Sequence, residues 1–166
     1  MDIRVVRDIM LPDPPVVSPD DSLGMAGRMM LEHNQRRLAV VDDEGHLAGI
    51  ISDRDLRLAA DSPLLEETSA EMLETLQKHT VREIMTTAVH TIEADAPIVE
   101  AAQLMRVAKV GGLPVVEFDD SGNRERLVGM VNQSMLLDYL IMLLDDADRV
   151  EMEAGETVEG TVVDEG

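Results

Sequence analysis

The chain has 166 residues, enough for one compact domain or two small units that share a core, and too few for a large multidomain enzyme. Its 34 Asp and Glu residues against 14 Lys and Arg give a net charge of −20, which repels phosphate backbones and anionic lipid and argues against nucleic-acid and membrane partners. The lack of cysteine excludes disulfides and thiolate-bound metals and fits a cytoplasmic location.

The N-terminal half predicts one β-α-β-β-α unit. After VRDIM at 6–10, a short extended stretch, PVVS at 15–18, leads to an acidic cap at Asp20 and a helix. Two strands follow, LAVVD at 38–42 and LAGIIS at 47–52, and a closing helix begins after the second strand. Apolar residues at helical spacing predict the buried face of the first helix: Leu23, Ala26 and Met30.

Residues 61–80 predict a connecting helix. The stretch LLEETSAEMLETLQKHT at 64–80 lacks Gly, and Pro63 stands in front of it. We therefore expect a packed helix instead of a flexible tether. Its apolar residues fall on one side: Leu65, Met72, Leu73 and Leu76.

The C-terminal half repeats the first half. VREIM at 81–85 lies over VRDIM at an offset of 75 residues, and the offset grows to 80 after an insertion in the segment EFDDSGNRER. The same elements follow: an extended VHTI at 89–92, an acidic cap at Asp95, and the strands LPVVEF at 113–118 and LVGMVN at 127–132. The predicted helix face again has helical spacing, with Ile98, Ala101 and Met105.

The segment 145–166 differs in composition from the rest of the chain. It holds nine acidic residues and one Arg, with little apolar periodicity. We expect part of it to continue the last helix and the remainder to be a mobile acidic tail.

This tandem pattern resembles a CBS-domain pair, also called a Bateman module. The resemblance rests on two units that each open with V-R-[DE]-I-M and, in the first, close with a strand ending G-I-I-S-D-R-D-L. It implies an α+β fold in which unit 1 (1–60) and unit 2 (81–144) form a pseudo-twofold pair. The lack of any other domain further resembles the stand-alone CBS proteins of the acetoin-utilisation type.

The resemblance also implies a function. Such modules sense adenosine-containing ligands, and AMP, ADP, ATP and S-adenosylmethionine are the candidates. Homodimers are common in the family, so we expect a homodimer that signals to a regulated protein, with no catalytic residues, no required cofactor and no enzymatic activity. The alternative is a ligand-free scaffold for dimerisation and protein contact.

Ser52 and Asp55 are the ribose-binding residues that the resemblance implies. A carboxylate accepts hydrogen bonds from both ribose hydroxyls, and a nearby Ser adds one more. The S-x-x-D spacing is also that of an ordinary capping box, in which Ser52 and Asp55 bond to the helix start. The two interpretations are compatible.

Three arginines are candidates for phosphate binding: Arg36, Arg37 and Arg54. Each offers bidentate donors in a chain that is otherwise strongly acidic. Alternatively, Arg36 and Arg37 only solubilise a strand start or pair with Glu32. The resemblance also implies an adenine pocket, which periodicity alone would describe as core: Val16, Val17, Leu38 and Ile51.

The second copy departs from the motif. Asn132 replaces Ser52 and Met135 replaces Asp55, while Gly111-Gly112 stands where the first copy has Arg36-Arg37. Thr91 and Asn132 remain as polar groups, so we expect a weaker second site and one occupied site per chain.

No metal site is expected. The four histidines form no i, i+4 pair and no HExxH arrangement, and Asp42-Asp43 has the composition of a turn. Neither a secretory signal nor a membrane-spanning segment is predicted, since the apolar run from Met135 to Leu144 is short and contains Asp138.

Overall fold

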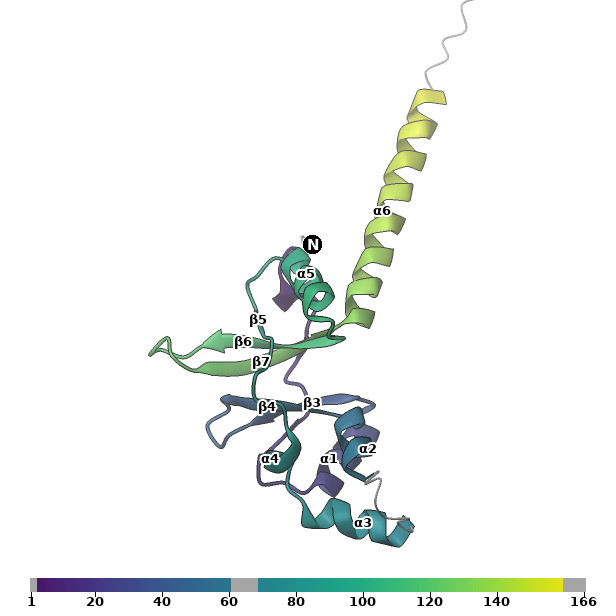
Figure 1. Ribbon diagram of the computed structural model, residues 1–166. Helices are drawn as coiled ribbons and strands as arrows, with labels where there is room; N and C mark the ends of the chain where they lie inside the picture. Colours follow the sequence, from purple (N-terminus) through teal and green to yellow (C-terminus); the bar gives the residue numbers. More distant parts are fainter. Residues whose placement is uncertain (1–2, 61–68, 160–166) are drawn as a thin grey trace, which may run out of the picture.

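A computed structural model describes residues 3–60 and 69–159 (Figure 1). The N-terminal repeat comprises η1 (Val6–Asp8), β1 (Leu11–Pro12), β2 (Val16–Val17), α1 (Leu23–His33), β3 (Arg37–Val41), β4 (Leu47–Ser52) and α2 (Asp53–Ala60). The remainder comprises α3 (Ser69–Lys78), α4 (Val81–Ile84), β5 (Ile92–Glu93), α5 (Ile98–Ala108), β6 (Gly112–Phe118), β7 (Glu125–Asn132) and α6 (Gln133–Glu159).

Each repeat forms one small sheet with the same pairing. In the first, β2 is parallel to β3 and β3 is antiparallel to β4; in the second, β5, β6 and β7 pair in the same way. The two sheets are stacked, with α1 and α2 outside one sheet and α5 outside the other (Figure 1). The prediction of an α+β fold built from two β-α-β-β-α units is confirmed.

Helix α1 buries the predicted face. Leu23, Ala26 and Met30 pack against Leu38 and Val40 of β3 in the first core cluster. In the second cluster, Ala101 and Met105 of α5 pack against Leu113 and Val115 of β6, which correspond to Leu38 and Val40. Burial of aliphatic side chains on both sheets therefore supplies the core in a chain with almost no aromatic residues.

The two VR[DE]IM segments exchange partners. Val6 is fully buried in the core of the second repeat, and Val81 is fully buried in the core of the first. The backbone N–H of Val6 donates to Ala96 O at 2.9 Å, and that of Val81 donates to Asp21 O at 2.8 Å. The boundaries 1–60 and 81–144 thus follow the repeat in sequence, whereas packing places each opening segment on the other repeat.

The exchange explains the recurrence of Asp20 and Asp95. The prediction that these residues cap α1 and α5 is wrong. Ser22 caps α1 by accepting from Met25 N–H at 3.0 Å, and α5 begins after Pro97 without a side-chain cap. The two aspartates instead bind the arginines of the exchanged segments, in the pairs Arg82–Asp20 and Arg7–Asp95.

Close backbone contact accompanies the exchange. The antiparallel pair β1–β7 brings Leu11 O to 2.9 Å from where a Cβ on Gly129 would lie. In the first repeat, Thr86 O lies 2.7 Å from the Cβ position of Gly49. The glycine that recurs at an offset of 80 residues is therefore needed for the approach of the opposite segment.

The Asp8 side chain forms hydrogen bonds with the backbone of the N-terminal segment. Its Oδ2 accepts from Arg4 N–H at 2.9 Å and Val5 N–H at 3.0 Å, and these bonds lower the pKa of the carboxyl below its ordinary value of 3.8. A lowered folded-state pKa means that the stabilisation is present above the unfolded-state pKa and is lost as pH falls through the folded-state value.

We therefore expect Asp8→Asn to remove part of the acid sensitivity of folding. The amide oxygen still accepts hydrogen bonds but does not titrate near pH 3.8. Urea unfolding of both proteins between pH 6 and pH 2.5 measures the effect: the wild type should lose its advantage over the variant as pH falls. A stability difference that does not change with pH would contradict the assignment.

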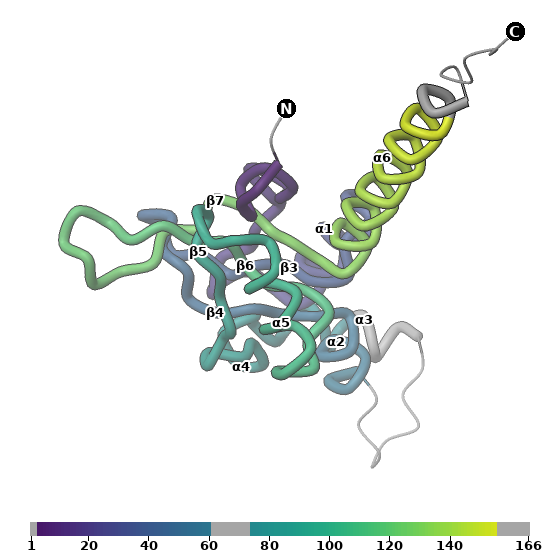
Figure 2. The backbone as a smooth tube through the Cα atoms, turned by 90° about the horizontal axis from the view of Figure 1, so that it is seen from above, coloured from purple at the N-terminus to yellow at the C-terminus, as the bar shows by residue number. Residues whose placement is uncertain are grey.

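Helix α6 extends far beyond the second core. It continues through Glu159, about 40 Å in length, and projects away from both sheets in two perpendicular views (Figures 1 and 2). The expectation that part of 145–166 continues the last helix is thus confirmed for 145–159, while residues 160–166 of the expected mobile remainder lie outside the described residues. Of the predicted connecting helix, 69–78 is helical and Leu65 lies outside the described part.

Candidate functional site

The ribose motif of the first repeat forms a capping box at the junction of β4 and α2. Ser52 N–H donates to Asp55 Oδ2 at 2.8 Å, and Asp55 N–H donates to Ser52 Oγ at 3.2 Å. The structural alternative considered for this motif is therefore present. Both side chains are half-buried, and these bonds leave Asp55 Oδ1 and the Ser52 hydroxyl hydrogen for other partners.

The second repeat keeps only part of this arrangement. Asn132 Oδ1 accepts from Met135 N–H at 3.0 Å and so caps α6. Thr91, the other polar residue predicted for the second site, donates its hydroxyl to Glu125 Oε1 at 3.1 Å. Without an acid at residue 135, the turn offers a ligand fewer acceptors than its counterpart in the first repeat.

A polar cavity of about 520 Å³ lies between the repeats. It brings the start of β3 against the end of β7 and the first turn of α6, and both predicted arginines of the β3 start line it. Among the described residues its lining includes neither Asp55 nor Arg54, and Arg54 is exposed on α2. The lining residues are Asn34, Gln35, Arg36, Arg37, Gly111, Gly112, Met130, Asn132, Gln133 and Ser134.

Arg37 crosses from the first repeat to the second. A Cβ on Gly111 would lie 2.6 Å from Arg37 Nη2, and one on Gly112 would lie 3.4 Å from Nη1. The paired glycines, which sequence reasoning treated as the loss of an arginine pair, thus provide the space that the Arg37 guanidinium occupies. Ser52 is the cross-strand partner of Arg37, so the ribose motif adjoins the same cavity.

The charges of the two arginines at the cavity are not neutralised locally. Among the described residues, Arg7, Arg82 and Arg124 take part in ion pairs, whereas Arg36 and Arg37 take part in none. The alternative of a pair with Glu32 is therefore not found. In a chain of net charge −20, these two unpaired guanidinium groups are a local concentration of positive charge beside a polar cavity.

The residues predicted for an adenine pocket are mostly core residues. Val17, Leu38 and Ile51 are no more than 2% exposed and belong to the first core cluster. Val16 at the start of β2 is half-buried. Three of the four side chains are therefore buried by their packing neighbours and leave almost no surface for an adenine ring in this conformation.

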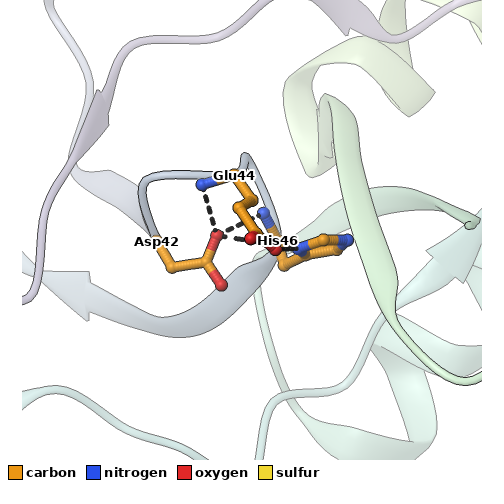
Figure 3. Close-up of side chains that lie close together, drawn as sticks. All are labelled: Asp42, Glu44 and His46. Carbon is orange, nitrogen blue, oxygen red and sulfur yellow. Dashed lines mark hydrogen bonds and ion pairs between the residues drawn. The ribbon is translucent and has the colours of Figure 1, made fainter.

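Sequence reasoning missed a second polar cluster. Asp42, Glu44 and His46 converge at the turn between β3 and β4 (Figure 3). The alternation D-x-E-x-H was the available signal, with a potential metal ligand at every second residue of a short turn. The helical i, i+4 spacing of histidines does not include this pattern.

An apolar groove of about 770 Å³ separates α5 from α6. It is lined by Ile98 and Ala102 of α5, by Leu136 and Leu140 of α6, and by Ile3. Beyond it, Ile141 and Leu144 of α6 are more than half exposed. Within the described ranges, no helix combines the length and apolarity needed to cross a membrane.

Comparisons with known proteins give a consistent result. The family model described as CBS domain matches residues 6–62 and 81–142. The chain is 45% identical over 141 residues to a CBS domain-containing protein of Dictyostelium discoideum, covering 85% of the chain and 94% of that protein. Some other curated relatives are longer, and the chain spans between a fifth and a third of their length.

Two solved structures are similar across most of the chain. A Vibrio cholerae protein assigned to acetoin utilisation is 29% identical with a TM-score of 0.70, covering 90% of this chain and 98% of that chain. CBSX2, solved in complex with AMP, is 27% identical with a TM-score of 0.65, covering 84% of this chain and 97% of that chain.

Proposed function

The chain belongs to the CBS-domain family, and on this premise we propose that it is a regulatory module that binds an adenosine-containing ligand. CBS pairs are typical ligand-binding regulatory modules, and the similar protein CBSX2 was solved with AMP. The ligand is proposed to change the equilibrium between two arrangements of the repeats, which it can do only through a difference in affinity for the two. We propose no enzymatic activity.

The observation that carries this proposal is the unpaired arginine pair at the inter-repeat cavity. Arg36 and Arg37 face a polar space with no carboxylate among its described lining residues. A phosphate supplies the missing counter-charge and accepts bidentate hydrogen bonds. We therefore propose AMP, ADP or ATP as the ligand class, ahead of S-adenosylmethionine, which has no phosphate.

One ligand per chain is proposed, held by both repeats. Its phosphate would contact Arg36 and Arg37, and its ribose would contact Ser52 and Asp55, which adjoin the cavity through the pairing of Ser52 with Arg37. Arg54 remains a proposed phosphate contact from the exposed side of α2. Thr91 and Asn132 remain a proposed weaker second site, because Met135 offers no ribose acceptor.

Calorimetric titration of the purified chain with AMP, ADP, ATP and S-adenosylmethionine tests the proposal. We expect one nucleotide per chain, with the phosphate-bearing ligands bound more tightly than S-adenosylmethionine. No nucleotide binding below millimolar concentration would reject the proposal and leave the scaffold function. The lack of cysteine favours a cytoplasmic setting for either function, which stays a prediction.

We also propose a homodimer, in which α6 packs against a second copy of the chain. Leu137, Leu140, Ile141 and Leu144 recur at i, i+3, i+4 and i+7 and are 48–58% exposed. An apolar stripe at this spacing is normally covered, and isolated helices of this kind are marginal in water. The regulated protein is a further proposed partner, for which the acidic end of α6 is the available surface.

The double variant Leu140→Asp, Leu144→Asp is expected to be monomeric. Buried charge at the helix contact costs several kcal/mol, whereas the same side chains are exposed in the single chain, so folding should be retained. Light scattering coupled to size exclusion measures the mass, and Val150→Asp, farther along α6, serves as the matched control. A wild type that is monomeric at 100 µM would contradict the dimer.

A further inference from the structure

The turn between β3 and β4 gathers two carboxylates and an imidazole. One ligand atom from each of Asp42, Glu44 and His46 lies within 4.8 Å of the other two (Figure 3). His46 Nδ1 is 3.4 Å from Glu44 Oε2 and 3.7 Å from Asp42 Oδ1. Asp42 Oδ1 accepts the backbone N–H groups of Glu44 and His46, each at 2.9 Å, and these bonds fix the turn.

His46 is buried without a hydrogen-bond partner. Its side chain is 10% exposed, and neither ring nitrogen makes a hydrogen bond in the described structure. Buried polar groups are normally satisfied, because an unsatisfied one costs about 1–3 kcal/mol. In a neutral imidazole whose Nδ1 is unprotonated, the lone pair faces two carboxylates, and a cation held between the three groups would satisfy all of them.

The far side of the same ring faces a third carboxylate. His46 Nε2 lies 3.4 Å from Asp119 Oδ2, at the turn that follows β6. Histidines that bind metals usually direct their other ring N–H toward a carboxylate or carbonyl, which fixes the tautomer. With the proton on Nε2, Nδ1 is free to act as a ligand.

The distances fit one class of ion. Zinc binds nitrogen and oxygen ligands at about 2.0–2.2 Å, so two ligands at a tetrahedral angle lie about 3.4 Å apart. The separations of 3.4 and 3.7 Å from Nδ1 match this spacing. Calcium and magnesium prefer oxygen ligands alone, which disfavours them at an imidazole.

We propose that Asp42, Glu44 and His46 bind a divalent transition-metal ion of the zinc class, with Asp119 orienting the imidazole. Three protein ligands leave one position for water. Glu44 is two-thirds exposed, which leaves a path for the ion from solvent. Because Asp119 belongs to the other repeat, the ion would join the two hairpin turns.

Arg124 is the competing cation at this cluster. Its guanidinium contacts Glu44 Oε2 and Asp42 Oδ2, each at 3.0 Å. The Asp42 contact uses the oxygen that does not face His46, whereas the Glu44 contact uses the oxygen that does. Metal binding therefore requires Arg124 to release Glu44. Removal of the Arg124 side chain should consequently increase the affinity for the metal ion.

Zinc titration of the untagged, chelator-treated chain by calorimetry tests the proposal, with magnesium as the hard-cation comparison. We expect one zinc ion per chain and a thermal midpoint raised by zinc. His46→Ala and Glu44→Gln should each weaken binding at least tenfold, and Asp119→Asn about tenfold. Arg124→Ala should strengthen binding, because the competing charge is removed.

His90→Ala is the matched control, since His90 is exposed and remote from the cluster in sequence. It should leave zinc affinity unchanged. Equal affinity in His46→Ala and His90→Ala, or several weak sites unaffected by Glu44→Gln, would overturn the proposal and assign zinc binding to the acidic surface in general. Glu44 is exposed, so its variant remains informative if His46→Ala fails to fold. None of these zinc titrations depends on nucleotide binding, so their failure would be distinct from failure of the proposed function.

Discussion

Gly49→Ala lowers the free energy of unfolding by about 1–3 kcal/mol, the usual cost of overpacking. The new Cβ would lie 2.7 Å from Thr86 O, an oxygen held by the backbone bonds that Ile50 and Thr86 exchange at 2.9 and 3.0 Å. It would also lie 3.0 Å from Met85 Sδ. The thioether can move, but the carbonyl can do so only by breaking the contact between the exchanged segment and β4.

The helical Gly27→Ala is the matched control and should have the opposite sign. Its Cβ would meet only Leu56 Cδ1, at 3.6 Å, so the variant gains helix propensity of about 0.5–1 kcal/mol without a clash. Urea denaturation of both variants measures the difference. Gly129→Ala, the equivalent substitution in the second repeat, should behave like Gly49→Ala. Equal stabilities for all three would show that the exchanged segments adapt freely.

Replacing Arg37 with alanine lowers AMP affinity by about 10- to 100-fold, as expected for the loss of charged hydrogen bonds. The guanidinium lines the inter-repeat cavity, and it forms no ion pair with any of the described residues. Arg36→Ala should cause a loss of the same kind. Arg37→Lys should be intermediate, because an ammonium keeps the charge without the bidentate fork.

The control for this series is Arg28→Ala, which removes an exposed charge on α1 outside the cavity lining. Calorimetry at fixed salt compares the four variants with the wild type. Asp55→Asn adds a test of the ribose contact, since the amide oxygen can still accept the Ser52 N–H but is a weaker acceptor for a ribose hydroxyl. Unchanged AMP affinity in Arg37→Ala would move the ligand away from the cavity, whatever the result for Asp55.

Much of the architecture could be predicted from the repeat. The recurring apolar positions located α1, α5 and the paired strands, because a core built twice leaves the same pattern twice. The capping box formed by Ser52 and Asp55 could also be predicted from its spacing, whereas their contact with ribose stays a prediction. These are local properties, and local spacing is what a single sequence carries.

The rest depended on which repeat each segment packs against. The sequence VRDIM does not indicate that Val6 packs in the core of the second repeat, because its apolar pattern would be the same if it packed in the first. The same limit hid the path of Arg37 to Gly111 and the approach of Asp119 to His46, since both contacts join the two repeats. How far α6 continues into the acidic segment could not be predicted, because that segment has little apolar periodicity to mark a helix.

The exchange of the opening segments also bears on how the chain is made. On the ribosome, the first repeat cannot close its core until Val81, which directly follows the connecting segment 61–80, has left the exit tunnel. Val6, synthesised among the first residues, must wait for β6 and β7 before it has a place to be buried. The first repeat therefore cannot complete its core from residues 1–60 alone, so its core closes only after synthesis has passed the midpoint of the chain.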